Sequence, residues 1–304
     1  MMPLRSLIFL LLFLPCLASF ASPPLVDAEW LQANRERAGL VILDLQADQA
    51  YQRYHIPGAV HTNFADWRRK TPAGVPQIIP PVADLERLIG NLGITNTSHV
   101  ILVVTGSSAG EMASATRVYW TFKALGHDAV SILDGGLIAY AQTRKYPLQK
   151  GSNKPRPNSF KASLRTEYLP DAQQVKAAIS EDVLPVDNRS QAEYLGIYTG
   201  GEKERAGSLP GAVHLNYDWL TVNGGGRFQS LENLKTIYRA SKVPLSGPQL
   251  NYCHTGLRAS LGWFVSHELL GNQQARLYDG STAEWAVDPS LPMEASVKLC
   301  SRDC

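Results

Sequence analysis

The sequence predicts an α/β protein built from two similar domains. Apolar runs typical of buried parallel strands alternate with periodic helical segments along the 304 residues, and the same order starts again near the middle of the chain. Two copies of one α/β unit account for this length better than a single large domain. We expect a first domain at 22–148 and a second at 161–304, joined by a polar, Pro/Gly-rich linker at 149–160.

The first copy is defined by its strands and helices in order. We expect buried strands at 40–45, 99–104 and 130–136, the last of which ends in a turn. Periodic segments predict helices at 27–32, 82–92 and 113–125. A Pro-Gly turn within Ile56-Pro57-Gly58-Ala59-Val60-His61 leads into a further short strand.

The second copy repeats this order. Helices are expected at 171–179, 231–240 and 259–270, and strands at 183–187, 249–252 and 275–280. The Pro-Gly turn recurs as Leu209-Pro210-Gly211-Ala212-Val213-His214, and Asp134-Gly135 recurs as Asp279-Gly280. The second copy is longer, and we place its extra residues at 196–207.

The net charge and the motifs of the sequence argue against several classes of function. Lys+Arg 29 against Asp+Glu 27 gives a formal net charge of +2, so there is no electrostatic reason to expect nucleic acid or an anionic membrane as a partner. The sequence contains no His, Cys and carboxylate cluster with metal-ligand spacing and no glycine-rich nucleotide loop. We therefore expect no metal and no cofactor.

The first 21 residues have the pattern of a signal peptide. Arg5 precedes an apolar run at 7–14, and Ala18-Ser19-Phe20-Ala21 offers a cleavage site with Ser22 as the mature start. No second apolar segment of spanning length occurs, so we expect an exported protein with no stable membrane span after cleavage. The expected compartment is a bacterial periplasm, and a eukaryotic secretory route is the alternative.

The candidate nucleophile is Cys253. It lies between the strand expected at 249–252 and the helix expected at 259–270, where backbone N–H groups and the positive end of a helix favour a thiolate. The alternative is a small buried cysteine with a packing role. Gly256 and Arg258 in the following loop favour the nucleophile. The first copy carries Gly106 at the equivalent position, so one copy has the means for this chemistry and the other lacks them.

The cysteine count gives a second reason to consider Cys253. Removal of the signal leaves Cys253, Cys300 and Cys304. Cys300 and Cys304 could form a disulfide in an oxidising compartment, which would leave Cys253 unpaired. Alternatively, the two lie in a disordered tail as incidental thiols.

With these residues in view, the chain resembles the tandem-domain rhodanese family of thiosulfate and 3-mercaptopyruvate sulfurtransferases. The resemblance covers nearly all of the mature chain. It rests on the two Pro-Gly-Ala turns, the two Asp-Gly turns, the Cys253 loop, Glu284-Trp285, Asp187-Asn188-Arg189 and Tyr194-Leu195-Gly196. It implies a parallel sheet with helices on both faces in each domain, with an inactive first domain and an active second one.

The resemblance also implies a mechanism of double displacement. Cys253 would take a sulfane sulfur from a donor as a persulfide and pass it to a nucleophilic acceptor such as cyanide or a thiol. The loop of His254, Thr255, Gly256, Leu257 and Arg258 would hold the persulfide through its N–H groups. Arg258 would hold an anionic donor or favour the thiolate.

Two further arginines are candidates for contact with the donor. Arg189 falls where the resemblance places a substrate-binding arginine, but it could instead form a bracing ion pair with Asp187 or Glu193. Arg205, in the extra residues of the second copy, is a weaker candidate for contact with the anion.

The chain departs from the family pattern at three positions. His254 and Thr255 occupy the first two loop positions, and Ser208 replaces the histidine that His55 keeps before the first Pro-Gly turn. The choice between thiosulfate and 3-mercaptopyruvate therefore stays open.

Two other functions are considered. A persulfide carrier or redox partner would use the same residues without efficient turnover. A cysteine-dependent phosphatase is a remote alternative, because only four residues separate Cys253 from Arg258 and such phosphatases need one more to surround a phosphate.

Overall fold

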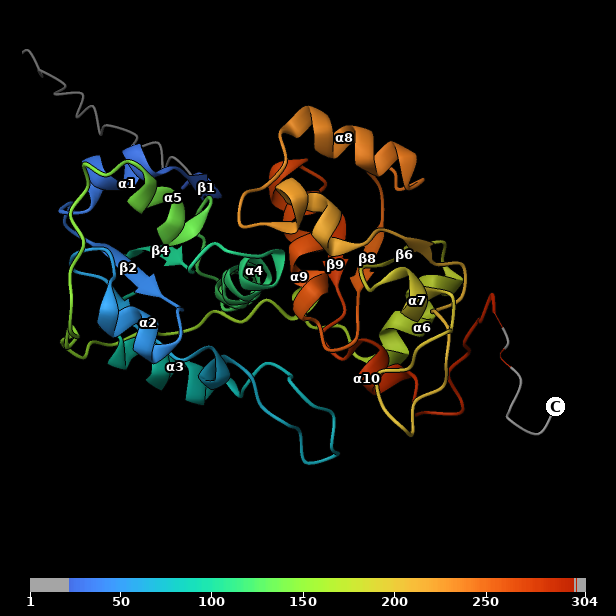
Figure 1. The fold of residues 1–304 in the computed structure, drawn as a ribbon. Helices are drawn as coiled ribbons and strands as arrows, with labels where there is room; N and C mark the ends of the chain where they lie inside the picture. The colour runs from blue at the N-terminus through green and yellow to red at the C-terminus, as the bar shows by residue number, and fades with distance from the viewer. Residues whose placement is uncertain (1–21, 298, 300–304) are drawn as a thin grey trace, which may run out of the picture.

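The computed structural model describes residues 22–297 and 299, which form two parallel sheets (Figure 1). The first has five strands in the order β1-β5-β4-β2-β3: β1 (Leu25–Val26), β2 (Leu40–Asp44), β3 (Val60–His61), β4 (His99–Val103) and β5 (Val130–Leu133). The second has four in the order β7-β6-β8-β9: β6 (Leu184–Asp187), β7 (Val213–His214), β8 (Gln249–Tyr252) and β9 (Ala275–Leu277). Each neighbouring pair runs parallel, as the apolar strand runs predict.

Helices cover both faces of the first sheet. The helices α3 (Val82–Asn91) and α4 (Ala109–Ala124) pack on one face, where their apolar side chains meet Val100 and Leu102 of β4. The opposite face, which carries Ile101 and Val103 of the same strand, packs against α1 (Ala28–Asn34), α2 (Asp48–Arg53) and α5 (Gly136–Gln142). Successive residues of one strand thus serve two cores, as strand geometry requires.

The second sheet is covered in the same way. One face packs against α8 (Leu231–Ala240) and α9 (Leu257–Phe264), which continues as a π-helical turn, Val265–Leu269. The other packs against α6 (Ala172–Ser180) and α10 (Ser281–Trp285). The short helix α7 (Gln191–Tyr194) follows β6, and the 3₁₀ helices are Phe64–Trp67, Thr166–Tyr168, Tyr217–Leu220 and Val222–Gly224.

The expected elements are present, with shifts at helix starts. The helix α4 begins at Ala109 rather than at 113, because the Ser108 side chain accepts the Glu111 N–H and caps it. The helix α9 begins at Leu257 rather than at 259, so Arg258 lies in its first turn. The elements not expected are short: β1, α2, α5, α7, α10 and the 3₁₀ helices.

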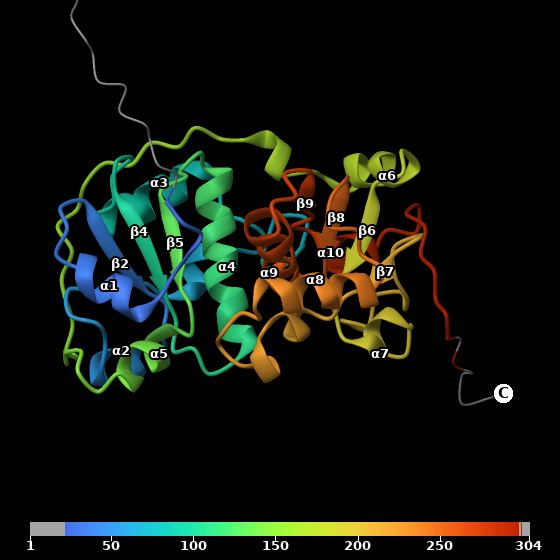
Figure 2. The same cartoon turned by 90° about the horizontal axis from the view of Figure 1, so that it is seen from above.

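The two domains meet along α4 and α9, which lie side by side at the centre of the molecule (Figure 2). The hydroxyl groups of Thr116 on α4 and Ser260 on α9 lie 2.9 Å apart and are buried. The Tyr119 hydroxyl donates to Glu268 at 2.9 Å. One continuous apolar core includes side chains from both helices, so the domain interface is an extension of the protein interior.

Each domain also binds the Asp-Gly turn of the other. The Ile79 N–H of the first domain donates to Asp279 Oδ2 of the second at 2.9 Å. Reciprocally, the Phe228 N–H of the second domain donates to Asp134 Oδ1 of the first at 2.9 Å. Asp279 is bound further by Arg117 of α4, whose Nη2 lies 2.5 Å from Asp279 Oδ1 with both side chains buried.

The position in the first domain that corresponds to Cys253 has no space for a side chain. A Cβ on Gly106 would lie 2.0 Å from the Gly135 carbonyl oxygen. The second domain fills the neighbouring space with Gly226, whose carbonyl accepts the Gly135 N–H at 3.0 Å. The first domain therefore lacks both the thiol and the room for one.

Some expectations lie outside the described residues. These are the signal peptide at 1–21 and the Cys300 and Cys304 pair, and they stay predictions. Along the part of the chain that the structure describes, none of the helices is long and apolar enough to cross a membrane.

Replacement of Arg117 by methionine tests the domain interface. Methionine keeps an apolar stem over Trp120, on which the guanidinium stacks at 4.7 Å, but it leaves the buried Asp279 carboxylate without its cation. We expect Arg117→Met to lower the free energy of unfolding by about 3–5 kcal/mol in urea titrations. Arg87→Met, which breaks an exposed pair with Asp84, is the control, and an equal loss in both variants would contradict a special role for Arg117.

Candidate active site

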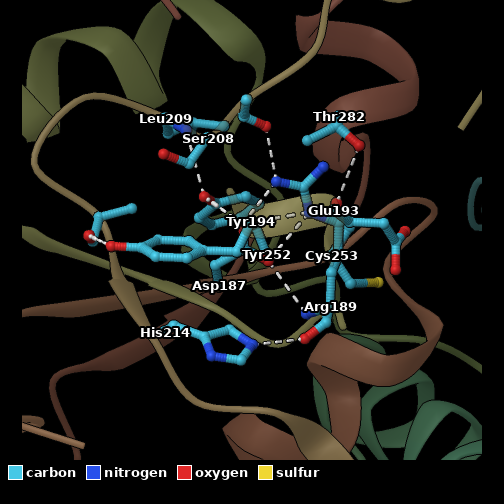
Figure 3. A network of polar contacts seen from close by, with 12 residues as sticks. Asp187, Arg189, Glu193, Tyr194, Ser208, Leu209, His214, Tyr252, Cys253 and Thr282 are labelled. Carbon is cyan, nitrogen blue, oxygen red and sulfur yellow. Dashed lines mark hydrogen bonds and ion pairs between the residues drawn. The ribbon is translucent and has the colours of Figure 1, made fainter. Parts of the chain in front are cut away.

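Cys253 directly follows β8 and lies just before α9 (Figure 3). Its side chain is 1% exposed, and its sulfur forms no disulfide within the described residues. The next three residues make a short turn that ends at Gly256, the N-cap of α9, with φ of 71°. The thiol therefore lies at the carboxyl edge of the second sheet, beside a helix N-terminus, as the sequence predicts.

The loop requires glycine at 256. Its φ is in the left-handed region, which favours glycine, and a Cβ there would lie 2.5 Å from Arg117 Nη1 and 2.9 Å from the carbonyl oxygen of Asp279. The cysteine loop thus packs directly against the ion pair that joins the domains.

Ser281 fixes the loop from the side of β9. Its hydroxyl oxygen accepts the N–H groups of Cys253 and Gly256, each at 3.1 Å, and its hydroxyl donates to the Tyr278 carbonyl at 2.8 Å. The Thr282 N–H also donates to the Cys253 carbonyl at 3.1 Å. The sequence patterns do not single out Ser281, because its hydrogen bonds join segments far apart in the chain.

Four N–H groups of the loop remain available to a ligand. The amides of His254, Thr255, Leu257 and Arg258 find no acceptor among residues 22–297. Leu257 and Arg258 are the first two residues of α9, whose amides have no intrahelical partner. This set can stabilise negative charge beside Cys253.

Arg258 is held by an ion pair. Its Nη1 and Nη2 bind the two carboxylate oxygens of Glu193 at 2.7 and 2.8 Å, and both side chains are largely buried. Burial works against the charge of Arg258, but Glu193 and then Cys253 hold its pKa above the ordinary value. Burial would raise the pKa of Glu193, yet the bonds from Arg258 and Ser190 lower it to about 2. Arg258 therefore lies close to the thiol with its charge already balanced by a carboxylate.

The structure favours the bracing alternative for Arg189. Its guanidinium is buried, binds Asp187 through Nε and Nη2, and donates to the Gly207 carbonyl at 2.7 Å. Asp187 also accepts the Tyr252 hydroxyl at 2.8 Å, so this network joins the ends of β6 and β8 beside Cys253 (Figure 3). Because these N–H groups of the guanidinium are already bound, the structure does not support the expected contact between Arg189 and the sulfur donor.

The structure gives Arg205 backbone carbonyl partners and does not favour the expected contact with an anion. Its guanidinium donates to carbonyl oxygens of the segment that follows α10, namely those of Trp285, Ala286, Asp288 and Leu291. Each of the three guanidinium nitrogens, Nε, Nη1 and Nη2, therefore already has a carbonyl acceptor. Arg205 therefore ties the extra residues of the second domain to its carboxyl-terminal segment.

His254 is also engaged. Its Nε2 lies 2.8 Å from Glu204 Oε1, so the segment of extra residues reaches the cysteine loop. Thr255 and Leu257 are half-buried at the mouth of the loop, where the sequence places substrate contacts. Within residues 22–297, no group of three or more His, Cys, Asp and Glu side chains could hold a metal ion.

Replacement of Ser281 by alanine tests the support of the loop. Two buried N–H groups, those of Cys253 and Gly256, would lose their acceptor, so we expect a stability loss of about 1–3 kcal/mol and slower reaction of Cys253. Thiol alkylation rates and urea titrations measure the two effects. Thr282→Val removes a neighbouring hydroxyl but leaves both amides paired, and an equal slowing in that variant would contradict the assignment.

Replacement of Glu193 by glutamine tests the ion pair through pH. Because the pKa of Glu193 is lowered to about 2, its charge stabilises the folded state above its ordinary pKa of 4.5, and this stabilisation is lost as the pH falls towards 2. We expect the wild type to lose about 1–3 kcal/mol more than Glu193→Gln between pH 6 and about 2.5. The measurement is chemical unfolding at each pH, with the exposed Glu181→Gln as the control; identical pH profiles for all three would contradict the pair.

Comparison with known proteins finds the same two domains. The Rhodanese-like domain family model matches twice, at residues 27–143 and 171–288. The thiosulfate sulfurtransferase of Mus musculus is 32% identical over 279 residues, covering 86% of this chain and 91% of that protein. A putative thiosulfate sulfurtransferase of Mycobacterium bovis is 31% identical, covering 89% and 97%.

Solved structures share the fold. SseA of Escherichia coli, described as a 3-mercaptopyruvate sulfotransferase, has a TM-score of 0.74 at 24% identity, covering 86% of this chain and 99% of that one. EanB in complex with ergothioneine has a TM-score of 0.77 at 22% identity, covering 91% and 71%. With two matched domains and relatives aligned along most of its length, this chain belongs to the rhodanese family.

Proposed function

We propose that this protein is a thiosulfate sulfurtransferase in which Cys253 carries the transferred sulfur as a persulfide. The observation that carries the proposal is the Cys253 loop: a buried, unbridged thiol is followed directly in the chain by four amides that have no acceptor within the described residues. The named activity of the relatives in Mus musculus and Mycobacterium bovis agrees with it.

The first half-reaction loads the thiol. The Cys253 thiolate attacks the outer sulfur of thiosulfate, a new S–S bond forms, and sulfite leaves with the electron pair of the broken S–S bond. The free amides of His254, Thr255, Leu257 and Arg258 face the charge that remains on the persulfide.

The second half-reaction unloads it. A nucleophile such as cyanide or a thiol attacks the terminal sulfur, and Cys253 leaves as the thiolate, so no external oxidant or reductant is needed. With 3-mercaptopyruvate as the donor, its C–S bond would break and the enolate of pyruvate would leave in place of sulfite, to take up a proton. Both donors are anions, and either could be met by the amides of the loop that have no acceptor among residues 22–297.

The same geometry argues against activity in the first domain and against phosphatase activity. Gly106 has neither a thiol nor the space for one. In the second domain only four residues separate Cys253 from Arg258, and the Arg258 guanidinium is bound to Glu193 rather than directed over the loop for a phosphate.

Replacement of Cys253 by serine tests the proposal. We expect Cys253→Ser to abolish thiocyanate production from thiosulfate and cyanide while the urea midpoint stays close to the wild type, since the two side chains are similar in size. After incubation with thiosulfate, mass spectrometry of peptides should find one added sulfur on the peptide that contains Cys253.

Two results would contradict the proposal. Added sulfur on Cys300 or Cys304 in place of Cys253 would show that the nucleophile is wrong. A wild-type protein that takes up one sulfur per chain and then stops would be a carrier rather than an enzyme. A parallel assay with 3-mercaptopyruvate establishes which donor is preferred.

A further inference from the structure

The sequence predicts three arginines of the second domain as contacts for the sulfur donor, and each of them binds another group of the protein. Arg189 binds Asp187, Arg205 binds backbone carbonyls, and Arg258 binds Glu193. The site that receives an anionic donor therefore needs a cation from elsewhere, and the first domain supplies a candidate, Arg68.

The backbone of the first domain carries Arg68 to the catalytic loop. Arg68 follows the 3₁₀ helix Phe64–Trp67, and the next residue, Arg69, forms an antiparallel bridge with Ile78. Arg68 is therefore placed opposite Ile79, whose N–H binds Asp279. Asp279 is only two residues before Ser281, which holds the Cys253 loop.

The guanidinium of Arg68 lacks a counter-ion. It lies over the Phe64 ring, with 4.3 Å between the guanidinium carbon and the ring centroid, and its Nε is buried without an acceptor. Within residues 22–297, its side chain makes neither an ion pair nor a hydrogen bond. The adjacent Arg69 differs, because it is more exposed and binds Asp84 at 2.9 Å.

The pKa of Arg68 is lowered but stays well above neutral pH. Burial and then Arg117 lower the pKa of Arg68 to about 10, while Asp279 and Cys253 act in the opposite direction. Arg68 therefore keeps its charge at neutral pH, and its backbone position beside Ile79 and Asp279 places it on the part of the first domain that faces the support of the Cys253 loop. A half-buried guanidinium that has no partner among residues 22–297 is stabilised when an anion binds it.

We propose that Arg68 of the first domain binds the anionic end of the sulfur donor while Cys253 of the second domain attacks its outer sulfur. The inference rests on the proposed function for the identity of the donor, but the anion site itself does not depend on turnover. The active site is then composite: the second domain provides the nucleophile and the amides, and the first provides the unpaired cation. The ligand class is a small anion with a sulfonate or carboxylate end.

The decisive experiment compares alkylation of Cys253 by iodoacetate, which is an anion, and by iodoacetamide, which is neutral. The probes report on charge at the site even in a protein that transfers no sulfur. Peptide mass spectrometry follows the Cys253 peptide alone. We expect Arg68→Met to lower the ratio of the iodoacetate rate constant to the iodoacetamide rate constant about tenfold, since one charge-assisted contact is lost. Arg69→Met should leave this ratio unchanged.

Kinetics with thiosulfate provide the second measurement. Arg68→Met should lower kcat/KM by about 10–100-fold, largely through KM, and Arg68→Lys should restore part of the loss because it restores the charge. If both alkylation rates fall together, or if the ratio in Arg68→Met equals that in Arg69→Met, Arg68 only supports the fold and the inference is wrong. If the ratio responds but no variant or wild type turns over thiosulfate, the anion site stands and the proposed donor fails.

Discussion

The structure depends on the carboxylate of Asp279, which is bound by two groups of the other domain. Arg117 supplies a buried cation and Ile79 supplies an N–H, so the end of β9 is fixed by the first domain. The turn that follows carries Ser281, which accepts the amides of Cys253 and Gly256. The position of the nucleophile is thus set through a chain of contacts that begins in the domain without a thiol. A buried pair of this kind costs desolvation, and its value here is that it specifies one arrangement of the domains.

Each domain donates a hydrogen bond to the Asp-Gly turn of the other, but the side chains that accompany these two contacts differ. Asp134 accepts Phe228 just as Asp279 accepts Ile79, so the two halves cover each other's Asp-Gly turns. The segment of the second domain that packs against the first carries Gly226, which fills the space beside Gly106. The segment of the first domain that packs against the second carries Arg68, whose charged side chain has no counter-ion among the described residues. Of two similar folds, one is therefore closed at this position, and the other has the Cys253 thiol there.

The sequence predicted the architecture well, and it predicted the place of Cys253 between a strand and a helix, because both depend on local patterns. Apolar runs identify parallel strands, the repeat identifies two domains, and a lone thiol between strand and helix identifies Cys253. The partners of the arginines could not be predicted, since they are set by contacts between distant residues. Arg258 and Glu193 are 65 residues apart, and nothing in either segment names the other. Arg68 was missed for the same reason: in the sequence it is one of two adjacent arginines, and only the fold separates the one bound to Asp84 from the one without a counter-ion.

The packing at Gly106 has a consequence for how this protein could change. A single substitution that placed cysteine there would put its Cβ 2.0 Å from the Gly135 carbonyl oxygen, in space that the second domain also occupies with Gly226. A second working thiol would therefore require the loop at 224–226 to be rebuilt at the same time, which would disturb the contact with Asp134. The assembly of the two halves thus excludes a thiol from the first half, and substitutions that alter sulfur chemistry are expected to act through the second half.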